Sequence, residues 1–297
     1  KLSAQTHIGG LKLDEVLVAR DGTRKLLLQP WDGHRIETVV MPMGDRITQC
    51  LSSQVGCKIG CRFCLTARMP TRRDLSAAEI VDQVLWGAHV VSSPEAADMP
   101  RDRVTNLVYM GMGEPLDNFE SVMDSIHILL EESGQNYAGR RITVSTSGIA
   151  SKIPELGHRA PVNLALSLNA SSDASRKRLI PINRKWNIES LIEALEAFPL
   201  PPRRRITVEY VLLADVNDSL EDAKRLKGLL RSLKPKIKVN LIPFNPWPGA
   251  PYGRPEPARV DAFGRLLRAA HYHVTVRYSK GDDIGAACGQ LDGAIAA

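Results

Sequence analysis

The sequence lacks several features that would define its class. Cysteine occurs only five times in 297 residues, an odd and sparse count that argues against a disulfide framework. No run of 18 apolar residues is present, so we expect no transmembrane helix. The seven histidines show no metal-ligand spacing, and there is no pair of C-x2-C units of the kind that binds zinc. These absences exclude a disulfide-rich secreted scaffold and a membrane-spanning protein.

Length and composition predict a folded protein with a large core. Hydrophobic residues make up 43% of the chain, enough for one large domain with or without a small appendage. Lysine and arginine number 39 against 33 acids, and the resulting charge of +6 suits a polyanionic partner. The chain opens at Lys1 with a polar run unlike a signal peptide, so we expect a cytoplasmic protein whose upstream segment is missing.

Two hydrophobic patterns divide the chain. Residues 12–41 hold three short apolar segments separated by Asp21-Gly22 and Asp32-Gly33, which predict a small β meander. Beyond it, apolar runs at 47–53, 106–111, 142–146, 162–168, 206–213, 238–244 and 274–278 alternate with helical periodicity at 76–91, 119–132, 151–158, 188–198, 220–233 and 258–271. The alternation predicts an α/β fold, an incomplete (β/α)6 barrel with its site at the carboxyl ends of the strands. We expect residues 1–45 to form the β extension and residues 46–297 the barrel.

Three closely spaced cysteines follow the first expected barrel strand. Cys57, Cys61 and Cys64 form a C-x3-C-x2-C motif. Three thiolates at this spacing suit a 4Fe-4S cluster whose fourth iron stays open to a small molecule, as in radical S-adenosylmethionine (SAM) enzymes. The alternative is a structural zinc ion with a fourth ligand from elsewhere. The other two cysteines, Cys50 and Cys288, are compatible with buried small hydrophobes or with catalysis.

Polar and glycine residues follow several of the expected strands. The turn from Gly111 to Leu116 suits a close approach of the backbone to a ligand, and its Glu114 suits an ammonium group. Further strand ends carry Ser145, Ser167, Asn169 and Asn245, which predicts that they point into the barrel mouth. For each one alone, a cap or turn hydrogen bond is the simpler interpretation. The Pro- and Gly-rich stretch 243–257 predicts a rigid loop at this mouth.

Four separated motifs together resemble one family. They are QCLSSQVGCKIGCRFC, GMGEPL, VNLIPFNPWPGAPYGR and GDDIGAACGQL, and they closely resemble the RlmN branch of the RlmN/Cfr radical SAM methyltransferases over residues 35–292. The resemblance implies a dual-specificity enzyme that methylates carbon 2 of an adenine in the peptidyl-transferase centre of 23S rRNA and of the adenine beside the anticodon in tRNA. It also implies two SAM molecules per turnover and an electron donor such as a flavodoxin. The family's N-terminal accessory domain is expected to be absent, and the protein is expected to be a monomer.

The resemblance assigns roles residue by residue. Cys57, Cys61 and Cys64 match the cluster ligands, Cys288 the methyl carrier, Cys50 its disulfide partner and Glu37 the proton acceptor. SAM-contacting positions are matched by Gly113, Glu114, Ser145, Ser167, Leu168, Asn169 and Asn245. We expect Asp282 and Asp283 to oppose ionisation of the Cys288 thiol. Either Glu37 or the Cys50 thiolate is the base that removes the ring proton.

The chemistry explains why such a scheme is needed. Carbon 2 of adenine is not nucleophilic, so it cannot attack the SAM sulfonium directly. In the implied route the methylated Cys288 loses a hydrogen atom to a SAM-derived radical, bonds to the ring, and is released when Cys50 forms a disulfide with it.

Five clusters of basic residues allow two interpretations. Arg72-Arg73, Arg140-Arg141, Arg176-Lys177-Arg178, Arg184-Lys185 and Arg203-Arg204-Arg205 suit either RNA phosphates or a solvated surface. Two alternative functions stay open at this point: a Cfr-like carbon-8 methyltransferase, and an RNA-binding protein that a metal stabilises without catalysis.

Overall fold

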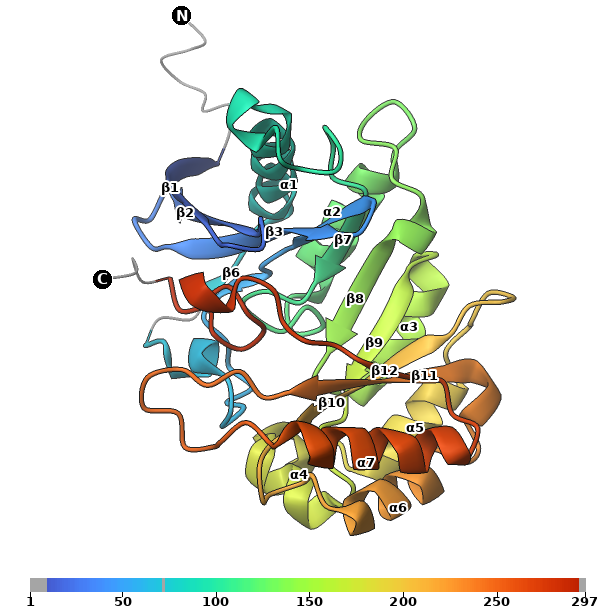
Figure 1. The fold of residues 1–297 in the computed structure, drawn as a ribbon. Coiled ribbons are helices and arrows are strands. Elements are labelled where there is room, and N and C mark those ends of the chain that lie inside the picture. Colours follow the sequence, from blue (N-terminus) through green and yellow to red (C-terminus); the bar gives the residue numbers. More distant parts are fainter. Residues whose placement is uncertain (1–9, 71–72, 294–297) are drawn as a thin grey trace, which may run out of the picture.

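The computed structural model describes residues 10–70 and 73–293, and one ten-stranded sheet organises them (Figure 1). The strand order is β1-β2-β3-β4-β7-β8-β9-β10-β11-β12. The strands are β1 (Leu11–Val18), β2 (Arg24–Pro30), β3 (Ile36–Met43), β4 (Arg46–Cys50), β7 (Asn106–Tyr109), β8 (Ile142–Thr146), β9 (Asn163–Ser167), β10 (Ile206–Leu212), β11 (Ile237–Pro243) and β12 (Val274–Val276). A separate two-stranded ribbon joins β5 (Gln54–Val55) to β6 (Arg73–Asp74).

The strands from β4 to β12 are all parallel, and helices cover their outer face. The helices are α1 (Ala77–Ser92), α2 (Phe119–Leu130), α3 (Ile153–Arg159), α4 (Asp173–Leu179), α5 (Ile188–Glu196), α6 (Leu220–Leu229) and α7 (Pro257–Ala269). Six β/α units therefore precede β12, and the sheet does not close on itself. The predicted incomplete (β/α)6 barrel is confirmed.

The meander at residues 12–41 is also present as β1, β2 and β3, which pair antiparallel. It continues the barrel sheet, because β3 pairs antiparallel with β4. The expected division between residues 45 and 46 falls at the turn between these two strands and stays a prediction. Residues 1–9 of the expected extension lie outside the described residues.

Local sequence signals explain where helices begin. Ser76 caps α1 with a capping box: its side chain accepts the Glu79 amide and its own amide donates to the Glu79 carboxylate at 2.8 Å. Such a cap stabilises a helix by about 1 kcal/mol. The side chains of Ser172, Asn187 and Ser219 likewise accept an amide in the first turn of α4, α5 and α6, although these helices have no capping box.

One helix was not predicted. Residues 173–179 of α4 read as a basic cluster because they contain too few apolar residues for a helical pattern. The structure buries one of these residues completely: Arg176 is 0% exposed, whereas Lys177 and Arg178 are exposed. Neither proposed role for the cluster, phosphate binding or a solvated surface, applies to Arg176. Arg72 lies outside the described residues, and its neighbour Arg73 pairs with Asp32 and Glu79.

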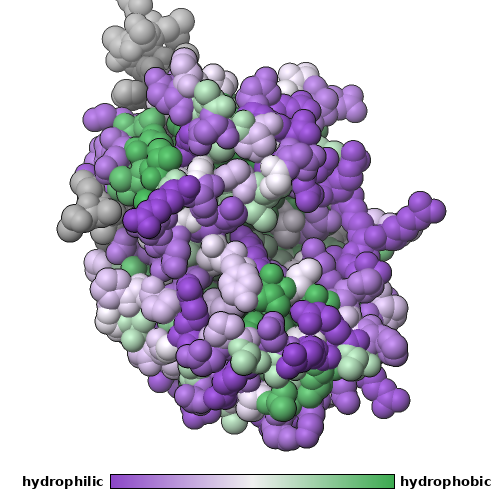
Figure 2. Space-filling view, viewed as in Figure 1, coloured by the Kyte–Doolittle hydropathy of each residue, from purple (hydrophilic) through white to green (hydrophobic). Residues whose placement is uncertain are grey.

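The surface is mainly hydrophilic on the face drawn in Figure 2, with hydrophobic residues in small separate patches. Within residues 10–70 and 73–293, no helix combines the length and the apolar character needed to cross a membrane.

Candidate active site

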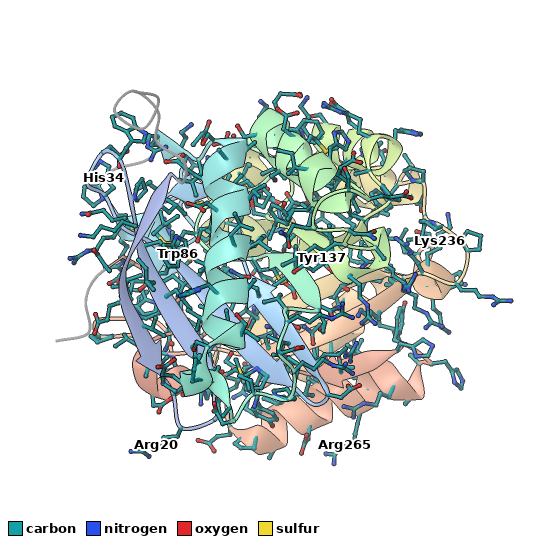
Figure 3. All side chains as sticks on the ribbon, turned by 90° about the horizontal axis from the view of Figure 1, so that it is seen from above. Arg20, His34, Trp86, Tyr137, Lys236 and Arg265 are labelled. Carbon is teal, nitrogen blue, oxygen red and sulfur yellow. The ribbon has the colours of Figure 1, made fainter. Side chains whose placement is uncertain are left out.

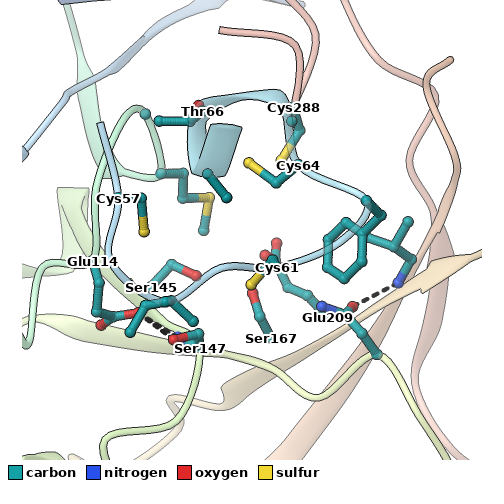
Figure 4. Close-up of a pocket in the computed structure, with 18 of the residues that line it drawn as sticks. Cys57, Cys61, Cys64, Thr66, Glu114, Ser145, Ser147, Ser167, Glu209 and Cys288 are labelled. Atoms are coloured by element: carbon teal, nitrogen blue, oxygen red, sulfur yellow. Dashed lines mark hydrogen bonds between the residues drawn. The ribbon is translucent and has the colours of Figure 1, made fainter. Parts of the chain in front are cut away.

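The cysteine loop, residues 56–70, leaves the barrel between β5 and β6, whose pairing clamps its base. Gly56 and Gly60 have φ values of 68° and 74°, a left-handed conformation that favours glycine. The Cys64 amide donates to the Cys61 carbonyl at 3.2 Å, which tightens the turn between these two cysteines. The loop therefore directs its three thiols toward one pocket (Figure 4).

This pocket lies at the carboxyl ends of the parallel strands. Its walls contain Cys57, Cys61 and Cys64 together with the distant Cys288. The predicted residues at the strand ends line it as well: Gly113, Glu114, Ser145, Ser167, Asn169 and Asn245. The fold thus gathers most of the predicted site residues around one space. Their roles as ligand contacts stay predictions.

Backbone hydrogen bonds bring Cys288 to the cysteine loop. The Leu65 amide donates to the Gly289 carbonyl at 2.8 Å. The Thr66 hydroxyl donates to the Leu291 carbonyl at 2.6 Å, across 225 residues of sequence. In Figure 1 the red C-terminal segment accordingly passes beside the light-blue cysteine loop. No sequence spacing could reveal this proximity, because it depends on how the chain returns after β12.

The loop after β11 supports both segments. Trp247 is buried and its indole N–H donates to the Phe63 carbonyl at 3.2 Å, which packs this loop on the cysteine loop. The Asn245 amide group donates to the Cys288 carbonyl at 3.2 Å and to the Ser279 hydroxyl at 2.7 Å. Asn245 therefore positions Cys288 in addition to facing the pocket. This result gives the predicted rigid loop a structural purpose.

Glu114 is buried with both carboxylate oxygens engaged. One oxygen accepts the Ser147 amide at 2.7 Å and hydroxyl at 2.6 Å, and the other accepts the Leu116 amide at 3.0 Å (Figure 4). Burial raises its pKa, and these hydrogen bonds oppose that effect. A carboxylate oxygen has two acceptor sites, so capacity for an ammonium donor remains.

The glycines near Glu114 are required for packing within the protein. A Cβ at Gly111 would lie 2.7 Å from the Ser52 hydroxyl and 2.8 Å from the Leu51 carbonyl. A Cβ at Gly113, whose φ is 99°, would lie 2.6 Å from the Gln54 Cβ. The sequence predicted that these glycines let a ligand approach the backbone closely. In the structure, the groups that approach the two glycines closely are residues 51–54 of the protein itself.

Cys50 and Cys288 are both thiols in this structure, and the charge of an ionised Cys50 would raise the pKa of Cys288. Burial raises the pKa of the Cys50 thiol to about 12. Cys288 is accessible because it faces the pocket, yet protein surrounds it, and this desolvation raises its pKa to about 12. Cys50 itself is half-buried at the end of β4 and does not line the pocket. A reaction between the two sulfurs requires one of them to lose its proton first.

A carboxylate that the sequence reasoning missed faces this pair. Glu209 on β10 is 5% exposed, lines the pocket and raises the pKa of both Cys50 and Cys288, while Arg277 lowers both. Asp282 and Asp283 are not among the largest influences on the Cys288 thiol, and their expected effect stays a prediction. Asp282 binds Arg254 at 3.4 Å, and Asp283 accepts the Arg20 amide at 3.1 Å. An acid within the apolar run 206–213 was the available signal for Glu209.

Glu37 and Leu168 lie near the site but not in the pocket wall. Glu37 is buried on β3, paired with Lys25 at 3.0 Å, and accepts the Asp292 amide at 3.1 Å. Burial raises its pKa and Lys25 opposes the shift. Leu168 is fully buried, and its carbonyl accepts from the Arg176 Nε at 3.0 Å. The proton-acceptor role of Glu37 stays a prediction.

Arg176 is the second residue that the sequence reasoning did not place. Its guanidinium donates to the carbonyls of Ser147, Ser167 and Leu168 and to the Asn183 side chain. Burial lowers its pKa to about 10, so it stays charged at neutral pH. It thereby ties the ends of β8 and β9 together beneath the pocket.

The donor set fits an iron-sulfur cluster. Three thiols in one pocket wall are the ligand type that such clusters require, with one thiolate for each of three irons. Within the described ranges, no three Cys, His, Asp or Glu side chains converge on a point as ligands of a single metal ion do. Separated thiols beside Glu114 and the polar strand ends are compatible with a cluster and a small molecule bound next to it.

Comparisons with known proteins agree with this geometry. Residues 51–226 match the Radical SAM superfamily. The chain is 47% identical over 287 residues to a "Dual-specificity RNA methyltransferase RlmN" of Syntrophobacter fumaroxidans, covering 95% of this chain and 81% of that protein. A protein of the same description from Anaeromyxobacter is 50% identical, covering 91% and 71% respectively. The crystal structure of a radical SAM methyltransferase from Sphaerobacter thermophilus superposes with a TM-score of 0.92 at 45% identity, covering 99% of this chain and 84% of that one.

Proposed function

The chain belongs to the RlmN family of radical SAM RNA methyltransferases, and from this premise we propose that it methylates carbon 2 of adenine in 23S rRNA and tRNA. One observation supports the proposal most: the pocket wall joins the three cysteines of the loop to Cys288 from the far end of the chain. A radical SAM enzyme without a methyl-carrying cysteine needs only the first three.

Each cysteine has a part in the proposed reaction. Cys57, Cys61 and Cys64 hold the 4Fe-4S cluster, and the polar strand ends with Glu114 hold SAM. When bound, the cluster and SAM supply an electron, a methyl group and hydrogen-atom abstraction. Cys288 accepts the methyl group on its sulfur, and its pocket-facing position exposes the methyl carbon to the adenine.

Cys50 closes the cycle. Its thiolate attacks the Cys288 sulfur, the S–C bond to the product breaks, and an S–S bond forms. The product carbon takes the electron pair and a proton and so becomes the methyl group of 2-methyladenine. An external donor, which we propose is a flavodoxin-like protein, then reduces the disulfide and would also supply the electron that the bound cluster delivers.

Proton transfers require a base near these sulfurs. Glu37 and the Cys50 thiolate are the two candidates for removing the ring proton. The high pKa of Cys50 makes it a strong base once ionised, whereas Glu37 is already paired with Lys25. A pH profile of kcat for Glu37→Gln separates the two, because loss of the base removes a limb of the profile.

The experiment uses anaerobically reconstituted protein with reductant, SAM and RNA. We expect 5′-deoxyadenosine together with 2-methyladenine in the RNA, and a methyl mark on the Cys288 peptide by mass spectrometry. Cys50→Ala should retain the mark and accumulate a covalent protein-RNA adduct, whereas Cys288→Ala should give neither. Formation of 8-methyladenine alone would assign the chain to the Cfr class, and bound zinc without an iron-sulfur absorption band would contradict the proposal.

A further inference from the structure

A second concave site lies at the opposite ends of the barrel strands. We call it the arginine pocket because five arginines line it with a single acid: Arg46, Arg101, Arg103, Arg140, Arg141 and Asp45. The pocket lies where β4, β7 and β8 begin, whereas the cysteines lie where these strands end.

The charges in this pocket are not balanced. The Asp45 carboxylate forms ion pairs with Arg101 at 3.5 Å and with Arg46 at 4.0 Å. Arg141 donates to the neutral Asn106 side chain at 3.3 Å. Neither Arg103 nor Arg140 has an ion-pair partner among the residues that the structure describes, and both are exposed. Positive charges gathered in a concave surface repel one another, and they attract anions from solution.

The pocket is also held in shape without a ligand. The Tyr137 hydroxyl donates to the Val104 carbonyl at 3.2 Å, which ties the loop before β8 to the segment before β7. Tyr137 lies beside α1 in Figure 3, in the part of the molecule where these segments meet. Gln135 and Asn136 are exposed in the same wall and add neutral amide donors. Arginines and amides on a fixed framework suit phosphate oxygens, because guanidinium groups bind them bidentately.

The position of the pocket decides which phosphate it can reach. Arg46 begins β4 and Cys50 ends it, so the two ends of this strand are about 13–17 Å apart at 3.3 Å per residue. An anion in the arginine pocket therefore cannot belong to the adenine being modified. It must belong to a part of the substrate several nucleotides away.

We propose that the arginine pocket is a second RNA site, which binds backbone phosphates of the substrate at a distance from the modified adenine. The inference rests on the proposed RNA methyltransferase function and adds a surface that discriminates by RNA length. Phosphate contacts carry no sequence information, but they fix the register of the RNA. A long folded RNA gains from the pocket, and a short oligonucleotide with the same adenine does not.

The test compares two substrates on the reconstituted full chain: a complete tRNA and a short oligoribonucleotide that contains the target adenine. Arg103→Ala/Arg140→Ala should raise KM for the tRNA about fivefold per arginine, on the order of 25-fold in all, with kcat unchanged. The slope of log affinity against log salt concentration should fall by about 2. KM for the oligoribonucleotide should stay unchanged.

Two controls sharpen the result. Arg265→Ala removes an exposed arginine from α7, outside the pocket, and should change neither KM. Arg103→Lys/Arg140→Lys keeps the charges and should restore most of the tRNA affinity, since counterion release depends on charge. An unchanged KM for tRNA overturns the proposal, as does an equal rise for both substrates or for the α7 control.

Failure of the pocket and failure of the proposed function are distinguishable. Binding of tRNA, measured by fluorescence anisotropy with no turnover, tests the pocket alone. Absence of methyladenine from the unmodified chain contradicts the proposed function, whatever the anisotropy result. If inorganic phosphate binds the pocket and tRNA does not, the site is one for small anions and the proposal is wrong.

Discussion

Replacing Arg176 by methionine tests whether a buried charge holds the strand ends of the site in place. The side chain is fully buried and donates to Leu168 O at 3.0 Å, Asn183 Oδ1 at 2.9 Å, Ser167 O at 3.3 Å and Ser147 O. Methionine is also unbranched and flexible but is shorter and has no donors, so these four acceptors would lose their partner. Each buried acceptor left unsatisfied costs about 1–3 kcal/mol.

The full sum overstates the loss, because removing the guanidinium also removes its own desolvation cost. Breaking a buried hydrogen-bond network is among the most destabilising single changes, and we expect Arg176→Met to lower the free energy of unfolding by about 3–5 kcal/mol. Tm should fall by about 5–8 °C for a chain of this size. KM for SAM should rise as well. Two of the acceptors that lose their donor are the carbonyls of Ser167 and Leu168, at the end of β9, where the proposed SAM contacts Ser167 and Asn169 lie.

Urea unfolding of the cluster-free protein measures the effect, with Arg178→Met as the matched control. Arg178 lies on the same helix and is exposed, so its replacement should change the unfolding free energy by no more than about 0.5 kcal/mol. If the two variants have the same urea midpoint at equal slope, the argument for Arg176 is wrong.

Four further predictions concern the pocket wall. Gly113→Ala should lower stability by about 2–4 kcal/mol in a thermal melt, because φ is 99° and the new Cβ would lie 2.6 Å from Gln54; a melt like that of the unmodified chain would contradict this. Glu114→Gln should raise KM for SAM at least about tenfold, because its two Ser147 donors would face an amide and the charge for an ammonium is lost; an unchanged KM would show that SAM does not use this carboxylate. The Cys288 thiol has a pKa of about 12, so its alkylation by iodoacetamide in cluster-free protein should accelerate about tenfold per pH unit from pH 7 to 9 without a plateau. Glu209→Gln should speed that alkylation at fixed pH, because the neighbouring negative charge that disfavours the thiolate is gone; peptide mass spectrometry reads both effects.

Much of the fold was predictable because its signals are local. β-branched apolar runs and helical periodicity report burial of one segment at a time, and they located every strand of the parallel array. Helix α4 was missed because Asp173–Leu179 carries four charges in seven residues and is held by its Ser172 cap and by Arg176 contacts with β8 and β9. Those contacts are tertiary, so the segment has no periodicity to reveal them.

Some residues of the candidate site were likewise predictable from local signals, and others were not. Spacing alone identified Cys57, Cys61 and Cys64, since ligands for one cluster on one loop must be close in sequence. The polar residues after β7, β8, β9 and β11 were predictable because parallel strands end at one edge of a sheet. Glu209 and Arg176 were not, because each is defined by burial beside groups on other strands.

By itself, the sequence determined the barrel, the cysteine motif and the family. Only the tertiary structure decided which groups meet: Cys288 beside the cysteine loop, Glu209 facing its thiol, and five arginines in one pocket at the far ends of the strands. The reason is physical. Local patterns record what one segment buries, whereas the ionisation of a thiol and the charge of a pocket depend on side chains from segments that are distant in the sequence.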